Sequence, residues 1–175
     1  MRSLILALSA LLAISAPASA EIIVMHGSDN LPMGYRVPKL PVMKGWKDVP
    51  KIGFVKLIPD GTEDATTPIS LTALAESTDQ APIDNIDDLF RRDREDLQRG
   101  APDTITTRLS DIADADGQKF TVYSFNTQKG WVARAYGVED NYLLTFSLTA
   151  RTKADYDKNF AVFADLVKRY AYKLR

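Results

Sequence analysis

Alternating apolar and polar residues predict a series of β-strands between residues 52 and 149. In the last of these segments Leu144, Phe146 and Leu148 share one face while Thr145 and Ser147 share the other, the period of two that a strand with one buried face requires. Six segments are expected to be strands: 52–58, 69–75, 104–112, 119–126, 131–138 and 142–149. The last four are separated by residue types that tolerate positive φ (Asp116-Gly117, Lys129-Gly130 and Asp140-Asn141), which favours an antiparallel meander.

Apolar residues spaced three and four apart predict two helices. Asn85 is the expected N-cap of a helix from Ile86 to about Arg99, which carries a narrow apolar stripe on an otherwise charged surface. A second helix is expected from Thr152 to about Tyr172, with a stripe made of Tyr156, Phe160, Phe163, Val167 and Tyr170. The pattern therefore predicts an α+β fold, in which about six mostly antiparallel strands are flanked by helices.

The first fifty residues are expected to have a different character. Residues 1–20 have the features of a secretory signal: Arg2, an apolar run over 4–14, and small residues at 18–20 that favour cleavage after Ala20. Residues 21–50 follow as an extended arm that contains proline and glycine, with a short edge strand at 22–25. Residues 51–175 are expected to form one α+β domain.

Composition narrows the function classes. After cleavage the chain has no cysteine, which excludes disulfides and thiolate chemistry, and no apolar stretch long enough to span a membrane. The 22 basic residues of the whole chain include Arg2, so 21 remain against 23 acidic ones. Because the two signs are interleaved along the chain, nucleic acid is not an expected partner. A bacterial periplasmic or secreted location is expected.

No pattern of reactive side chains predicts a catalytic, cofactor or metal site. The only histidine, His26, lies in the arm, where a triad would lack support from several rigid elements. The run 111–117 resembles a calcium loop, but the register fails, since Ile112 would occupy the first ligand position and Tyr123 that of the bidentate glutamate. Carboxylates at Asp84, Asp87 and Asp88 are accounted for by the positive end of a helix dipole. We therefore expect a protein that is not an enzyme.

Aromatic residues offer the candidate interaction site. Trp131 shares a strand face with Ala133 and Ala135, whereas Arg134 and Tyr136 share the opposite face, and only one face can lie under the last helix. Trp131 and Trp46 are therefore expected to join a second core with the other helix and the arm, or alternatively to line an exposed groove. The candidate interaction or cleft residues are Tyr35, Trp46, Trp131, Arg134 and Tyr136.

The sequence resembles the PsbP-like fold family in the order of its elements. The resemblance rests on Pro41–Trp46, a hairpin with a polar loop, one helix, the meander ending in Tyr142–Ala150, and the helical residues Phe160, Phe163 and Leu166. That family includes the extrinsic protein of photosystem II, the periplasmic DcrB lipoprotein and a Ran-binding nuclear import factor. The resemblance implies an α/β/α sandwich and a non-enzymatic accessory or assembly role in binding other proteins. It carries over no functional residue, and this chain lacks the acylated cysteine of the lipoprotein members.

The leading functional hypothesis is an exported, non-enzymatic protein that binds another protein of the bacterial cell envelope, with the arm lying across its partner. One alternative is a small-molecule-binding protein or hydrolase that uses a cleft near Trp46, Trp131 and Tyr136. Another is a structural envelope protein without a ligand. The sequence gives neither the oligomeric state nor the partner's identity.

Overall fold

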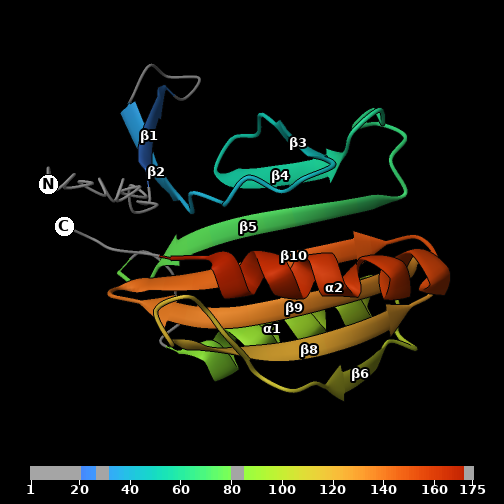
Figure 1. Cartoon of the computed structure of the whole chain (residues 1–175). Helices are drawn as coiled ribbons and strands as arrows, with labels where there is room; N and C mark the ends of the chain where they lie inside the picture. Colours follow the sequence, from blue (N-terminus) through green and yellow to red (C-terminus); the bar gives the residue numbers. More distant parts are fainter. Residues whose placement is uncertain (1–20, 27–31, 80–84, 172–175) are drawn as a thin grey trace, which may run out of the picture.

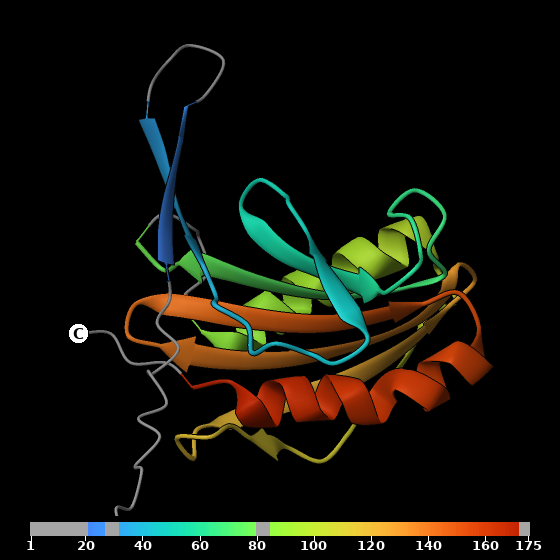
Figure 2. The same ribbon diagram turned by 45° about the horizontal axis from the view of Figure 1, so that its top comes forward.

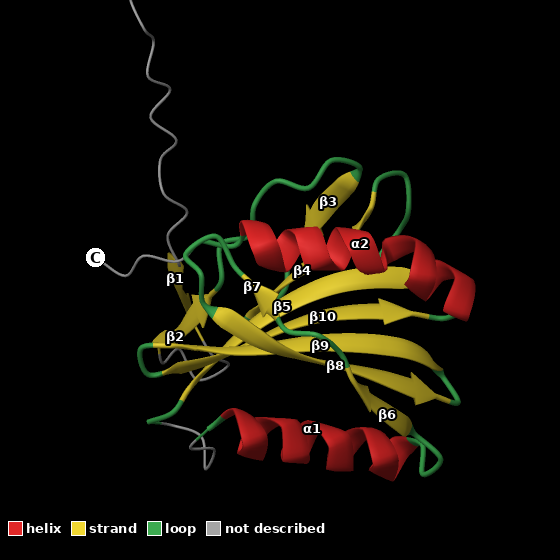
Figure 3. Cartoon of the chain, turned by 60° about the horizontal axis from the view of Figure 1, so that its bottom comes forward, coloured by secondary structure: helices red, strands yellow, loops and turns green. Residues whose placement is uncertain are grey.

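An eight-stranded antiparallel sheet forms the centre of the structure, and one helix lies on each of its faces (Figure 1, Figure 3). The computed structural model describes residues 21–26, 32–79 and 85–171. The strands follow the order β3-β4-β5-β10-β9-β8-β6, and β7 pairs with β8. The main sheet comprises β3 (Trp46–Val49), β4 (Phe54–Pro59), β5 (Ile69–Ser77), β6 (Ile105–Arg108), β7 (Ile112–Ala113), β8 (Lys119–Thr127), β9 (Gly130–Glu139) and β10 (Tyr142–Ala150). The predicted α+β fold with helices on both sides of an antiparallel sheet is confirmed.

Helix α2 (Lys153–Arg169) covers the face of the sheet that we call the α2 face. Thr152 caps its first turn by accepting a hydrogen bond from the Asp155 amide (3.1 Å). The predicted stripe is buried at Tyr156, Phe163, Val167 and Tyr170, whereas Phe160 is half-buried. Opposite this stripe lie the apolar side chains of the central strands, including Leu71, Ala73, Ala133, Ala135, Leu144, Phe146 and Leu148. Most of the hydrophobic core therefore lies between α2 and the sheet.

Helix α1 (Ile86–Gly100) lies on the opposite face, the α1 face (Figure 3). Its predicted cap is present, because the Asn85 side chain accepts a hydrogen bond from the Asp88 amide (3.0 Å). Leu89 forms a second, smaller core with Tyr136 and Leu143. Neither helix in the described part of the chain is both long and apolar enough to cross a bilayer.

The predicted turns between the last strands also form. Gly117 has φ +84° between β7 and β8, and Asp140 has φ +49° between β9 and β10. Gly130, at the start of β9, has φ +140°, and a Cβ there would lie 2.3 Å from the carbonyl oxygen of Ala150. Only glycine fits this position, because the backbone of the next strand approaches it directly.

Two strand predictions were wrong. The segment 104–112 forms two short strands, β6 and β7, instead of one. The pairs Arg108↔Tyr123 and Ile112↔Phe120 place three residues of this segment opposite two residues of β8, so the extra residue breaks the ladder as a β-bulge does. The sheet also gains a strand before residue 52, because β3 pairs with β4. These two differences raise the strand number from about six to eight.

The N-terminal part contains more regular structure than its proline content predicts. β1 (Glu21–His26), which includes the predicted strand at 22–25, pairs with β2 (Pro32–Val37) as a separate antiparallel hairpin at one end of the sheet (Figure 2). Residues 38–45 then run without regular structure to β3, which forms an edge of the main sheet. The expected secretory signal, residues 1–20, lies outside the described residues.

Truncation of the α2 stripe should distinguish its buried positions from its half-buried one. Phe163→Ala empties a fully buried site under α2 and should lower the free energy of unfolding by about 3–5 kcal/mol. Phe160→Ala removes the same atoms from a half-buried site and should cost clearly less. Urea unfolding followed by circular dichroism measures both, and equal losses would contradict the placement of the core.

Candidate functional site

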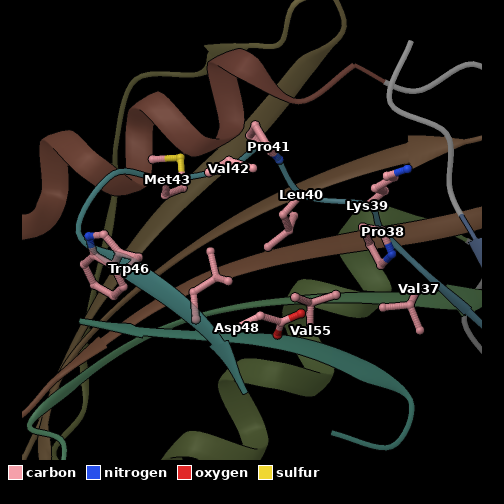
Figure 4. A pocket seen from close by; sticks show the side chains of 11 residues that line it. Val37, Pro38, Lys39, Leu40, Pro41, Val42, Met43, Trp46, Asp48 and Val55 are labelled. Atoms are coloured by element: carbon pink, nitrogen blue, oxygen red, sulfur yellow. The ribbon is translucent and has the colours of Figure 1, made fainter. Parts of the chain in front are cut away.

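A groove of about 330 Å³ lies on the α2 face between the β3–β4 hairpin and the residues that lead into it (Figure 4). We call Val37–Met43 the crossing segment. It forms one wall of the groove, and Trp46, Asp48, Val55 and Leu57 of the two strands contribute the rest of the lining. Of the described residues that line the groove, only Lys39 and Asp48 are charged. The groove is therefore mainly apolar and lies at the edge of the sheet.

The crossing segment is fixed by contacts to the core and to α2. Pro38 and Pro41 have restricted φ and no amide hydrogen, which favours an extended backbone there. Met43 is buried in the core under α2, where Leu57 of β4 also lies. At the end of α2 the Arg169 guanidinium donates a hydrogen bond to the Val42 carbonyl oxygen (3.3 Å) and lies 3.6 Å from the Met43 sulfur. The wall of the groove thus depends on the last turn of α2.

A tight turn brings the next residues to the opposite wall. Gly45 has φ +82°, and the Trp46 amide donates to the Met43 carbonyl oxygen (3.1 Å). The turn places the Trp46 indole beside the end of the crossing segment, as Figure 4 shows. The indole is half-buried and packs against the core under α2.

The open side of the groove exposes both apolar surface and charge. Val42 is 89% exposed, the most exposed large apolar residue of the described chain. The Asp48 carboxylate lies beside Val55, while the Lys39 amine lies at the other end of the groove and points away from it (Figure 4). Within the described part of the chain neither charge has an ion-pair partner. β3 begins the strand order, so its outer edge has no neighbouring strand among the described residues.

The alternative cleft near Trp46, Trp131 and Tyr136 does not form. Trp46 and Trp131 both pack against the core on the α2 face, and the Trp131 ring lies 5.6 Å from that of Tyr156. The prediction that Trp46 and Trp131 join a second core with α1 is therefore wrong. The strand face shared by Trp131 and Ala133 lies under α2, where Ala133 and Ala135 belong to the core. Tyr136 accordingly points to the α1 face.

The remaining candidates are divided between two places. Tyr35 lies in β2, where it pairs with Ile23, and its side chain is outside the described part. Arg134 and Tyr136 both contact Asp93 of α1: the Arg134 guanidinium lies 2.5 Å from its carboxylate, and the Tyr136 hydroxyl donates to it (3.0 Å). These contacts attach α1 to β9. Arg134 and Tyr136 thus have a structural role and lie outside the groove.

The Tyr136 contact predicts how stability depends on pH. Burial raises the pKa of the Tyr136 hydroxyl well above its usual range, and the Asp93 carboxylate raises it further. Above about pH 10 the unfolded tyrosine releases its proton while the folded one keeps it, so the free energy of unfolding falls as pH rises. Tyr136→Phe should make this decline shallower in urea unfolding between about pH 8 and 11.

Part of the alkaline decline should remain in that variant, because burial also raises the pKa of Tyr156. Declines of equal slope in the wild type and in Tyr136→Phe would contradict the buried contact with Asp93.

The acidic residues of the calcium-loop-like run 111–117 have local partners. Asp111 pairs with Arg108, and one oxygen of the Asp114 carboxylate accepts hydrogen bonds from the amides of Asp116 (2.9 Å) and Gln118 (2.8 Å). Burial raises the pKa of the Asp114 carboxyl group. In the described ranges no three histidine, aspartate or glutamate side chains gather as a metal site would need. His26 has no described side chain, and Asp84 lies outside the described residues.

No protein-family model matches this sequence, and no curated protein matches it. Among solved structures, the chain is similar to a Pseudomonas aeruginosa protein of unknown function, whose suggested role is that of a regulator. That similarity has 15% identity and a TM-score of 0.49, and it covers 74% of this chain and 99% of the other. The chain is also similar to the PsbP protein CyanoP of Synechocystis, with 15% identity, a TM-score of 0.42, and 71% and 91% of the two chains covered. At 15% identity and TM-scores below 0.5, neither similarity bears on the function of this chain.

Sequence reasoning found Trp46 but missed the other residues of the groove. Val42 and Asp48 belong to the predicted arm, and a single valine or aspartate there gives no sequence signal of a binding site. One signal was present: Pro38 and Pro41 flank apolar Leu40 in a stretch that cannot be helical. That pattern is typical of an extended segment anchored by alternate side chains.

Proposed function

We propose that this protein is a non-enzymatic, protein-binding protein of the bacterial cell envelope, and that it holds an extended segment of its partner along the groove. The observation that carries the proposal is the position of the groove, which combines an exposed apolar wall with the open edge of β3. An edge strand presents unpaired backbone N–H and C=O groups, to which an extended peptide can add as a further strand.

The lining of the groove favours a peptide over a compact ligand. Val42 is nearly fully exposed, and its burial by a partner would contribute about 1.5–3 kcal/mol. Trp46 provides one amphipathic ring of the kind enriched at protein interfaces. Among the residues that the structure describes, no second aromatic ring lines the groove to stack on a sugar or planar ligand from the other side. The small-molecule alternative therefore gains no support from the arrangement of the aromatic residues.

Replacing Val42 tests the groove. Val42→Asp puts a charge on the exposed wall without disturbing the core. Covering that charge should cost the complex at least about 1.4 kcal/mol, which corresponds to a factor of ten in affinity. The recovery of partners in affinity capture from envelope extract should therefore fall at least tenfold. Ile105→Asp is the matched control, because Ile105 is 62% exposed on β6 at the opposite edge of the sheet. Equal recovery with Val42→Asp and wild type would contradict the proposal, and capture of nothing by wild type would favour a structural envelope protein.

The envelope location rests on the signal-like residues at the start of the chain. Cleavage after Ala20 would make Glu21, the first residue of β1, the new N-terminus. Cell fractionation with intact-mass analysis should therefore find a periplasmic or secreted protein that begins at Glu21. A full-length chain that stays in the cytoplasmic fraction would contradict this part of the proposal.

A further inference from the structure

We infer that the partner segment carries a lysine or arginine opposite Asp48, with an apolar residue two positions away opposite Trp46. This inference rests on the proposed function and adds the chemistry of the partner. It follows from three features of the edge strand: its register, the unpaired carboxylate, and the apolar surface beside that carboxylate.

Register decides which side chains a new strand would meet. In the β3–β4 pair Trp46 lies opposite Pro59, and Asp48 lies opposite Leu57. Trp46 and Asp48 therefore share the face that lines the groove, whereas Lys47 belongs to the other face. A strand added to the outer edge of β3 would place every second side chain on the groove face. One of these would lie across from Asp48, and another, two residues along, would lie across from Trp46.

The charge of Asp48 decides what the opposite residue must be. A carboxylate that a partner covers without compensation loses hydration at a considerable cost, so an apolar or acidic residue opposite Asp48 is unfavourable. Lys39 does not compensate, because its amine points away from Asp48 at the far end of the groove (Figure 4). A lysine or arginine can lay its methylene groups on Val55 and still bring its charge to the Asp48 carboxylate.

The short edge strand also discourages other partners. Lys47 and Asp48 are adjacent and exposed in a strand of four residues, which is how proteins prevent unwanted strand pairing. The same two charges would admit a strand of complementary charge. Selectivity among partner segments then comes as much from weak binding of uncharged strands as from tight binding of the complementary strand.

The test uses three synthetic peptides of identical extended sequence, with alternating valine and threonine, that differ only at the central valine position: lysine, norleucine or glutamate. Binding is measured by the fluorescence of Trp46 in a Trp131→Phe background, where Trp46 is the only tryptophan. The lysine peptide should bind about two- to fivefold more tightly than the norleucine peptide, the range expected for an exposed cross-strand ion pair, and the glutamate peptide should bind most weakly. The preference should shrink as salt is added.

Variants at Asp48 separate the inference from the proposed function. Asp48→Asn should abolish the charge preference, and Asp48→Lys should reverse it in favour of glutamate. If all three peptides bind equally to wild type and Val42→Asp weakens them all, the groove binds peptides and the inference is overturned. If no peptide binds to wild type or to either Asp48 variant, the groove does not take extended segments, and the proposed function is overturned with it.

Discussion

The packing of the α2 aromatic stripe against β9 and β10 is the interaction on which the rest of the structure depends. Tyr156, Phe163 and Tyr170 lie on the strands that occupy the middle of the sheet, so α2 has one position and one orientation. That orientation brings Arg169 to the crossing segment and allows Met43 to enter the same core. The groove therefore depends on the core, although its open wall contributes little to stability.

Most of the fold was predictable because its elements have strong local signals. Both helices begin at the predicted caps, Asn85 and Thr152, since side-chain capping is decided by a few adjacent residues. The antiparallel meander was predicted from turn residues such as Gly130. The divided strand at 104–112 was not predictable, because a bulge depends on the register with β8 and not on the residue types in the segment itself.

The candidate site was less predictable than the fold. Trp46 was identified by its size and amphipathic character, but Trp131 was placed in the wrong core. Alternation along β9 gave the correct division of its two faces, yet only three-dimensional packing shows which face α2 covers. Asp48 is a candidate binding residue only because β3 is an edge strand and the crossing segment lies beside it. Both features depend on contacts between residues far apart in the sequence. Arg134 and Tyr136 were candidate interaction or cleft residues, but they attach α1 to the sheet through Asp93.

Amide hydrogen exchange tests the central claim, that a partner is held at the edge formed by β3. Exchange is compared between the isolated protein and its complex with the captured partner. The account predicts slower exchange at Trp46–Val49 in the complex, with no change at Ile105–Arg108 on the opposite edge. Protection at β6 or along α1, with exchange at β3 unchanged, would contradict it.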